Sequence, residues 1–461
     1  MIMQELTTLS IASLRRLLVQ REVSASELTE AYLSKLEKHD PALHSFVVVT
    51  AELAVDAAKH AAEKSGALTG IPFGIKDVID LKGVPTTGQS RSRANHIAEH
   101  NSTVVERLCE AGAVPLGKTA TWEFAHGGPS WDILFPPARN PWDLNRSPSG
   151  SSSGSAAAVA ARLTPFALGT DTGGSIRTPA AVCGVVGLKP TYGLVSRGGC
   201  IPNSFSQDHI GPITGTVEDA AIVLEAIAGY DVYDSGSVNR ERVQYIGYLE
   251  QAVPRGLRVG VPWKWFTQDS PVSLAVLSAF EASMKVLASL GAELEEVELP
   301  PLHEFEAVKK IIALSDLYSL HGPVLRHSPE LLGSNLRGRI VAGALLQADD
   351  LVQAQRLRGL LQRAMNKVFN QVEILALPMS EPASVLRAEP PESLFETLGF
   401  ASPFNVTGHP AISIPNGKTK DGLPLSLQLV GRHFCEARLL NVAHQMELVF
   451  DSIVGHPAGY M

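Results

Sequence analysis

The chain has 461 residues, of which 45% are hydrophobic and 19% are charged, as in a folded globular protein and unlike a disordered chain. Its formal net charge is -8, so it lacks the general attraction for phosphate on which most nucleic-acid-binding proteins depend, and we expect no nucleic-acid partner. Four scattered cysteines without a CxxC pair argue against a disulfide framework.

The N-terminal residues contain no basic segment followed by an apolar one, so we expect no secretory signal. The longest apolar run lies near residues 156–169, where Arg162 and Pro165 interrupt it. This run is shorter than the ~20 apolar residues that span a bilayer. The sequence therefore predicts a cytoplasmic protein without a membrane partner.

The first part of the chain, to about residue 66, is predicted to be helical. Ser24 and Glu27 have the spacing of a capping box, and apolar residues at helical spacing follow them. A second helix is predicted over Ala51–Ser65. After Gly70 the pattern changes, and Ile71–Ile79 is predicted to be an extended segment followed by a loop.

Beyond this point, helices and short apolar strands alternate along the chain. Helices are predicted over Thr103–Ala111, Ala156–Arg162, Val217–Ala228, Ser273–Leu290, Gly338–Phe369 and Cys435–Phe450. Strands are predicted over Ala113–Leu116, Phe166–Leu168, Leu257–Val261, Glu373–Leu377, Ala411–Ile414 and Leu425–Val430. The alternation is typical of an α/β layered fold with a mixed sheet. We expect one domain over residues 1–461, because the best linker candidate, Tyr230–Asn239, is short.

Residues 112–119, GAVPLGKT, match the P-loop pattern letter for letter. A P-loop is a flexible turn between a strand and a helix, and its N–H groups surround phosphate. Here a helix comes first and Ala113–Leu116 is predicted to be the strand itself. We therefore expect no nucleotide site.

Residues 150–154, GSSSG, match the GxSxG nucleophile elbow, with Ser152 as the exposed serine. That elbow needs a strand that runs directly into it. The residues before it include Pro141 and Pro148 and are predicted to form a loop, so we reject this interpretation.

Small residues cluster twice within residues 147–180, SPSGSSSGSAAAVAARLTPFALGTDTGGSIRTPA. Gly/Ser runs are often flexible linkers. This run instead continues into an apolar helix and a strand, and a second turn, Thr170–Ser175, follows that strand. Small residues at the edge of a buried layer indicate backbone that approaches a ligand closely.

These turns have features that serine catalysis requires. A serine hydroxyl is a weak nucleophile until a neighbouring base takes its proton. No histidine is evident for this task, but Lys76 lies in the apolar stretch FGIKDVI, where burial favours the neutral amine. A nest of successive backbone N–H groups is expected to hold the oxyanion of a tetrahedral intermediate. These groups belong to Thr172, Gly173, Gly174 and Ser175.

Several of these stretches resemble the amidase signature family, which is defined by a Ser–cis-Ser–Lys triad. The matching stretches are GIPFGIKDVID, GKTATWEFAHG, ARNPWDLNRSPSGSSSGSAAAVAA, LGTDTGGSIRTPAAVCGVVGLKPTYGLVSRGG, DHIGPITGTVEDAA and FNVTGHPAISIPNG. The resemblance covers most of residues 70–230 and a segment near the C-terminus. It implies a three-layer α/β/α fold with a large central mixed β-sheet flanked by helices. It also implies a catalytic core at about 67–235 and a variable substrate-pocket region at about 300–400.

By this resemblance, the base is Lys76, the cis-serine is Ser151 and the nucleophile is Ser175. Neutral Lys76 would draw a proton from Ser151, which draws one from Ser175, and Ser175 attacks the carbonyl carbon. The amine then leaves, and water releases the acyl or carbamoyl group. The family needs no cofactor. The fourteen histidines show no HExxH pattern and no tight cluster, so we expect no metal site.

Two departures from the family pattern stand out. The family commonly has GGSSGG where this chain has SGSSSG at Ser149–Gly154. The glutamine-using tRNA amidotransferase subunits of the family usually carry an MGSSTENS-like stretch where this chain has HGGPSWD at His126–Asp132. The second departure favours a stand-alone hydrolase over a glutaminase subunit.

Four further residues are candidate substrate contacts. They are His126, Gly127 and Gly128, which the resemblance places on the acyl side of the pocket, and Ser152, which is expected to tune the relay. Arg177, which follows the nucleophile, is expected to form a structural ion pair.

The leading hypothesis is an amidase acting on small or aryl amides, with carbamate (urethane) bonds as an extension. The alternative is a glutaminase-type subunit of an amidotransferase complex. A third hypothesis is a catalytically silent binding protein of the same fold, and retention of the whole triad argues against it. The expected partner is a small-molecule amide or carbamate substrate, and the oligomeric state is left open, with a homodimer as one alternative.

Overall fold

A computed structural model describes residues 3–64, 66–386 and 398–460 of the chain. Its described strands form one sheet of eleven, in the order β1-β3-β2-β4-β6-β5-β10-β11-β9-β7-β8. The strands are β1 (Phe46–Val49), β2 (Pro72–Lys76), β3 (Val114–Thr119), β4 (Phe166–Asp171), β5 (Val186–Lys189), β6 (His209–Thr214), β7 (Leu257–Val261), β8 (Ala292–Glu296), β9 (Ile374–Pro378), β10 (Ala411–Lys418) and β11 (Pro424–Gly431). The sheet is mixed, since β2 runs parallel to β3 and β4, whereas β6 is antiparallel to β4 and β5.

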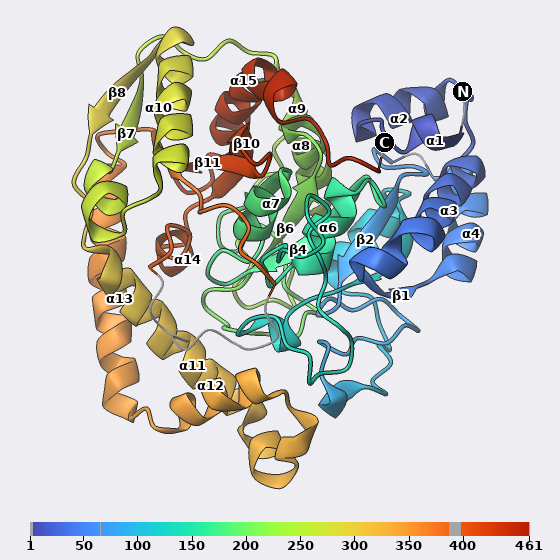
Figure 1. Ribbon diagram of the computed structural model, residues 1–461, viewed down its shortest axis with the longest axis horizontal. Helices are drawn as coiled ribbons and strands as arrows, with labels where there is room; N and C mark the ends of the chain where they lie inside the picture. Colours follow the sequence, from blue (N-terminus) through green and yellow to red (C-terminus); the bar gives the residue numbers. More distant parts are fainter. Residues whose placement is uncertain (1–2, 65, 387–397, 461) are drawn as a thin grey trace.

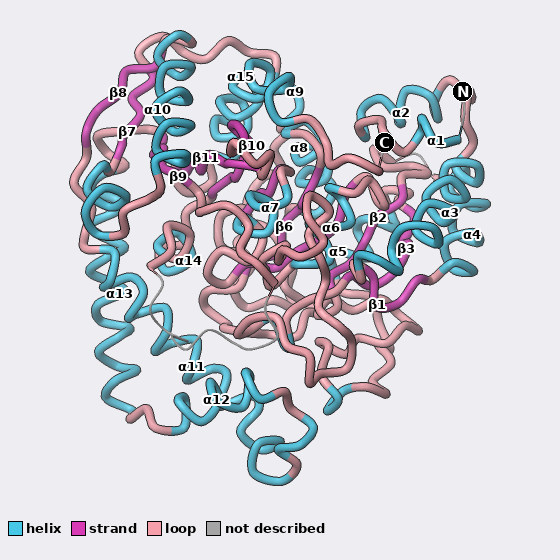
Figure 2. The backbone as a smooth tube through the Cα atoms, viewed as in Figure 1, coloured by secondary structure: helices cyan, strands magenta, loops and turns pink. Residues whose placement is uncertain are grey.

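Helices flank this sheet (Figures 1 and 2). They are α1 (Met3–Leu6), α2 (Ile11–Val19), α3 (Ala25–Leu43), α4 (Ala51–His60), α5 (Thr103–Glu110), α6 (Ser153–Ala160), α7 (Arg177–Cys183), α8 (Val217–Ile227), α9 (Ile246–Leu249), α10 (Leu274–Ser289), α11 (Leu302–His327), α12 (Ser334–Ala344), α13 (Ala348–Val368), α14 (Pro403–Val406) and α15 (Glu436–Val454). The predicted α/β fold with a large mixed sheet flanked by helices is therefore confirmed.

The two faces of the sheet are buried against different helices. On β4, Phe166 and Leu168 belong to the main hydrophobic core, whereas Ala167 between them packs with α6 and α7 in a second cluster. Side chains alternate between the faces of a strand, so these neighbours point to opposite layers. Small residues on the α6 side, such as Ala156 and Ala160, allow that helix to lie close to the sheet.

Most predicted elements are present, with boundaries shifted by a few residues. Helix α3 begins after Ser24, and the Ser24 N–H donates to the Glu27 carboxylate at 2.8 Å as the capping box predicts. Strand β7 coincides with the predicted range. The P-loop-like segment is confirmed as a strand, β3, and its Lys118 is buried in an ion pair with Asp77 at 3.0 Å.

The helical region after residue 300 differs from the prediction. The single helix expected over residues 338–369 is wrong, because α12 ends at Ala344 and α13 begins after Gln347. The Gln347 N–H donates to the Asp350 carboxylate at 2.8 Å, which starts a new helix at that point. Helix α11 was not predicted; it packs against α12 and α13 along one side of the molecule (Figure 1).

One sheet holds strands from both halves of the chain, from β1 to β11. This arrangement supports the single-domain interpretation, which stays a prediction. Part of the expected pocket region, residues 387–397, lies outside the described residues. No helix in the described ranges combines the length and apolar character needed to cross a membrane.

Candidate active site

Lys76 stands at the carboxyl end of β2. Strand β2 pairs in parallel with β4, with Gly74 opposite Ala167 and Ile75 opposite Leu168. Because parallel neighbours end at the same edge of a sheet, Lys76 lies beside the end of β4, and its Nζ donates to Thr170 Oγ1 at 2.7 Å. The carboxyl ends of strands are where α/β sheets commonly place ligands.

The Lys76 amine also contacts Ser151. Its Nζ donates to Ser151 Oγ at 2.7 Å, and both side chains are fully buried. Burial lowers the pKa of Lys76 to about 7, against smaller opposing effects from Cys200, Asp171 and Asp208. A large fraction of Lys76 is therefore neutral near pH 7, as the apolar sequence around it predicts.

Ser151 is presented by the loop before α6. The peptide bond between Gly150 and Ser151 is cis. The Trp122 indole covers Gly150 so closely that an added Cβ would lie 2.3 Å from its Cε2 atom, so only glycine fits there. The Ser151 carbonyl accepts a hydrogen bond from the Trp122 N–H at 3.2 Å, which fixes the loop.

Ser152 does not contact the expected substrate cavity. Its hydroxyl donates to the Thr170 carbonyl and accepts from the Thr170 N–H, both at 3.2 Å, and the residue is fully buried. The Ser152 hydroxyl thus joins the start of α6 to β4. The prediction that Ser152 contacts substrate is therefore wrong, because the backbone of β4 occupies its hydroxyl.

Ser175 lies in the turn between β4 and α7 and lines a cavity of about 310 Å³. Its carbonyl accepts from the Ser152 N–H at 3.2 Å, so this turn and the Ser151 loop lie side by side. Within the described part of the chain, the Ser175 hydroxyl makes no hydrogen bond. Lys76 and Ser151 lie behind the cavity wall, so Ser175 is the member of the predicted triad that faces open space.

The expected oxyanion nest is reduced by one donor. The Gly174 N–H donates to Asp171 Oδ1 at 2.7 Å, so the prediction that it holds the oxyanion is wrong in this conformation. The N–H groups of Thr172, Gly173 and Ser175 donate to none of the described residues. These three line the cavity and are available to a ligand.

Asp171 shapes the turn that carries Ser175. It forms a buried ion pair with Arg177, with Nη2 to Oδ1 at 2.9 Å and both side chains inaccessible to solvent. Burial alone would raise the pKa of Asp171, but the charge and hydrogen bonds of Arg177 hold it far below its usual range. Arg177 also donates to Gln428 and Asn405, so its structural role agrees with the prediction.

Helices α11 and α12 contribute part of the cavity wall. The described residues that line the cavity are Trp122, Ala125, His126, Gly127, Ser149, Gly150, Thr172, Gly173, Gly174, Ser175, Thr178, Asn203, Glu306, Lys309, Lys310, Ala313, Leu314, Arg339, Gly399 and Ser402. His126 and Gly127 are among these lining residues, whereas Gly128 is not, and the expected substrate contacts of His126 and Gly127 stay predictions. Burial lowers the pKa of His126 to about 3, so its ring is neutral, and its Nδ1 lies 3.2 Å from Asn203 Oδ1.

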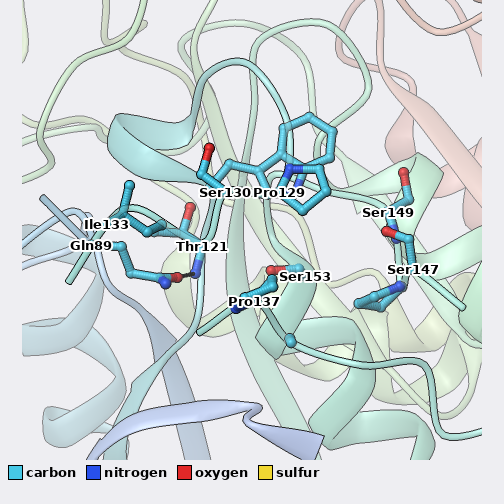
Figure 3. Close-up of a pocket in the computed structure, with 12 residues that line it drawn as sticks. Gln89, Thr121, Pro129, Ser130, Ile133, Pro137, Ser147, Ser149 and Ser153 are labelled. Carbon is cyan, nitrogen blue, oxygen red and sulfur yellow. Dashed lines mark hydrogen bonds between the residues drawn. The ribbon is translucent and has the colours of Figure 1, made fainter. Parts of the chain in front are cut away.

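Figure 3 shows a second, much smaller cavity next to the Ser151 loop, lined by Gln89, Thr121 and Ser153 among others. Its volume of about 10 Å³ leaves room for about one water molecule, so no amide fits there. Across the described ranges, no three His, Cys, Asp or Glu side chains converge as a metal site would require.

Sequence reasoning missed three contributors to the site. Thr170 was noted only as part of a turn, although its hydroxyl holds Lys76. Asn203 connects His126 to the loop before β6, and its Nδ2 donates to the Ala125 carbonyl at 2.8 Å. Lys309 on α11 reaches the cavity from 134 residues after Ser175, and no local pattern marks it.

Both the sequence and the fold of this chain resemble those of known proteins. The sequence profile of the family described as Amidase matches residues 27–440. A Glutamyl-tRNA(Gln) amidotransferase subunit of Caldanaerobacter subterraneus subsp. tengcongensis is 39% identical over 97% of this chain and 97% of its own length. The native peptide amidase of Stenotrophomonas maltophilia superimposes with a TM-score of 0.85 at 30% identity, covering 97% of this chain and 98% of that chain. A chain from a vestigial protein complex, described as revealing the origins of an s-triazine catabolic enzyme, has a TM-score of 0.89 at 29% identity, covering 96% of this chain and 98% of its own.

Proposed function

The chain belongs to the amidase family of enzymes that act on C–N bonds, and on that premise we propose that it hydrolyses amides through an acyl-enzyme on Ser175. One observation carries the proposal. The Lys76 amine lies 2.7 Å from Ser151 Oγ in a fully buried position, directly behind the cavity that Ser175 faces. A neutral amine next to a hydroxyl is a base–relay pair that can activate a serine.

The proposed reaction runs along three side chains. When substrate binds, the free Ser175 hydroxyl turns toward Ser151, Ser151 gives its proton to neutral Lys76, and Ser175 gives its proton to Ser151. The Ser175 oxygen attacks the amide carbon, and the N–H groups of Thr172, Gly173 and Ser175 stabilise the oxyanion. The proton returns from Lys76 through Ser151 to the leaving nitrogen, and water then hydrolyses the acyl-enzyme.

Two kinds of amide substrate are supported by different observations. The curated relatives that resemble this chain, at 38–40% identity over nearly its full length, are named as subunits of Glutamyl-tRNA(Gln) amidotransferase, which favours a glutaminase-type role with protein partners. The segment His126–Asp132 and the fit to the peptide amidase favour a stand-alone hydrolase of small amides, with carbamates as an extension. The relatives give the amidotransferase role the stronger support of the two. The cytoplasmic location and a homodimer stay predictions.

The acyl-enzyme is the direct test. The purified chain, incubated briefly with p-nitrophenyl butyrate and quenched in acid, should show the mass of one butanoyl group on the peptide that contains Ser175. A butanoyl group found on another residue, or none in the presence of turnover, would overturn the proposal. Assays of the same protein on glutamine, p-nitroanilides and carbamates then separate the two substrate candidates: an amidotransferase subunit should be nearly idle alone on all three, whereas a stand-alone hydrolase should turn over the anilides.

The pH dependence of the rate follows from Lys76. The base is the neutral amine and its pKa is about 7, so kcat/KM should fall as pH falls through that value. Well below it, the loss should approach about tenfold per pH unit, since each unit protonates about ten times more of the base. A profile of kcat/KM between pH 5 and pH 9, measured with an anilide whose acylation step is rate-limiting, should show this fall as its acidic limb. A residual rate in Lys76→Met protein should lack the limb, and a wild-type profile that is flat over the range would contradict the role of Lys76.

A further inference from the structure

The His126 ring is held in one state by Asn203. The Asn203 side chain donates from Nδ2 to the Ala125 carbonyl at 2.8 Å, and its Oδ1 lies 3.2 Å from His126 Nδ1. The opposite orientation of this amide would bring its oxygen against the Ala125 carbonyl oxygen. A carboxamide oxygen can only accept a hydrogen bond, so His126 Nδ1 must carry the ring proton. His126 Nε2 therefore carries a lone pair instead of a proton.

The His126 ring does not take up a second proton near neutral pH. Burial is the largest cause that lowers the pKa of His126 to about 3, and the positive charges of Arg339 and Lys309 act in the same direction. The hydrogen bond with Asn203 opposes this shift and is outweighed. The ring is thus a neutral acceptor at Nε2, and the surroundings that disfavour an imidazolium also disfavour any other cation placed beside it.

The Nε2 atom of His126 is open to the cavity in front of Ser175. His126 is one of the lining residues, and its Nε2 has no hydrogen-bond partner among residues 3–64, 66–386 and 398–460. The Nε2 atoms of three other histidines, His209, His321 and His409, are also unpartnered, but they are closed off from solvent. His126 Nε2 is not one of these closed-off atoms, so a molecule in the cavity can reach its lone pair.

This lone pair makes the cavity selective. A substrate that brings a hydrogen-bond donor to Nε2 replaces the bond to water, whereas an alkyl group there leaves the acceptor unpaired. Asp208 accepts from the Asn203 N–H at 2.8 Å and from the Thr172 hydroxyl at 2.6 Å. The wall with His126 therefore adjoins the oxyanion nest, whereas the leaving nitrogen must face Ser151 to receive its proton. The acyl part of the substrate is the part that meets Nε2.

We propose that His126 determines specificity by accepting, at Nε2, a hydrogen bond from the acyl part of the substrate, which carries an uncharged donor such as a hydroxyl group. This inference rests on the proposed hydrolysis at Ser175. It narrows the substrate to amides whose acyl part is polar and uncharged near the scissile carbonyl. Hydrolysis of a hydroxyacyl amide consumes one water and yields a hydroxy acid and an amine.

Two sets of p-nitroanilides test the inference, each with a terminal hydroxyl, methyl or ammonium group on acyl chains of equal length. The first set is glycolyl, propanoyl and glycyl, and the second is 3-hydroxypropanoyl, butanoyl and β-alanyl. In at least one set, wild-type kcat/KM should be about tenfold higher for the hydroxyl compound than for the methyl compound, the size of one hydrogen bond, and lowest for the ammonium compound. His126→Phe, which keeps a flat ring without the lone pair, should bring the hydroxyl-to-methyl ratio to about one.

His321→Phe is the matched control. The His321 ring stacks on Phe124, with 4.1 Å between the ring centroids, and lies outside the cavity lining. This variant should keep the wild-type ratio. Three results would overturn the inference and leave the hydrolase proposal standing: equal rates for hydroxyl and methyl compounds in both wild-type sets, faster turnover of the ammonium compounds, or a ratio that His126→Phe leaves unchanged.

Nitrogen NMR of protein labelled with ¹⁵N-histidine tests the inference without turnover. If no anilide is hydrolysed, the proposed function is in doubt, and this measurement decides the inference separately. The His126 signals are assigned by their loss in His126→Phe. Nε2 should carry no proton, and glycolamide or 3-hydroxypropanamide should shift its signal more than propanamide or butanamide does. A proton on Nε2, or no difference between the two kinds of amide, would overturn the inference.

Discussion

Ser175→Ala protein is expected to hydrolyse its best amide substrate about 10⁴-fold more slowly than wild type, or worse, since losing the nucleophile of a serine hydrolase removes nearly all covalent catalysis. Ser175 lines the cavity, whereas Ser151 and Ser152 are fully buried and are not among its lining residues. Substrate binding should persist, because the cavity wall is otherwise intact. Steady-state kinetics measure the rate, and titration with the product acid measures binding.

Ser155→Ala is the matched control for this loss. Ser155 is a buried serine of α6 whose hydroxyl donates to the Leu168 carbonyl at 2.9 Å, away from the cavity. Its removal should cost about 1 kcal/mol of stability and leave the rate within about twofold of wild type. A Ser175→Ala protein with more than about a tenth of the wild-type rate would show that another group is the nucleophile.

The candidate active site was partly predictable from local patterns, and the roles proposed for Ser151 and Ser175 followed from the family resemblance. Lys76 and its neighbour Asp77 are the charged residues of an otherwise apolar stretch, and the small residues before Ser151 and Ser175 mark turns at a buried edge. The burial of Lys76 and the close approach of the backbone to a ligand can both be predicted from the composition of a few neighbouring residues. Local sequence patterns are therefore enough to indicate them. Helix α3 and strand β7 were predictable for the same reason, since caps and apolar runs are local signals.

The part of the cavity wall that α11 and α12 form was not predictable, because it depends on tertiary packing. Helix α11 follows Pro301 and has no side-chain cap, and its apolar residues are interrupted by charges such as Lys309 and Lys310, so no periodic stripe identifies it. From the sequence alone, the Ser152 hydroxyl could equally well take part in the proton relay or form a structural hydrogen bond. Only its contact with β4 decides between them. The Gly174 N–H is likewise taken by Asp171 through a turn geometry that the sequence does not reveal.

Asp171→Ala is expected to lower the free energy of unfolding by about 3–5 kcal/mol, because it leaves the Arg177 guanidinium buried without its countercharge. Asp171 also accepts hydrogen bonds from the N–H groups of Gly174 and Ile176, at 2.7 and 3.2 Å. The turn that carries Ser175 should therefore loosen, and kcat should fall even at temperatures where the protein is folded. Urea denaturation gives the stability change, and assays below the unfolding transition give the rate.

Two further variants test whether the unpaired buried charge of Arg177 is the cause of the stability loss in Asp171→Ala. Asp143→Asn weakens the Asp143–Arg146 pair, whose side chains are 39% and 28% exposed, and should cost about 1 kcal/mol or less because solvent screens that pair. Asp171→Ala combined with Arg177→Met removes both buried charges and should be more stable than Asp171→Ala alone, since the unpaired guanidinium is the main cost. If the double variant were less stable than the single one, the hydrogen bonds from Arg177 to Gln428 and Asn405 would outweigh its charge. The turn would then be held mainly by those bonds, and the ion pair would contribute little to the geometry at Ser175.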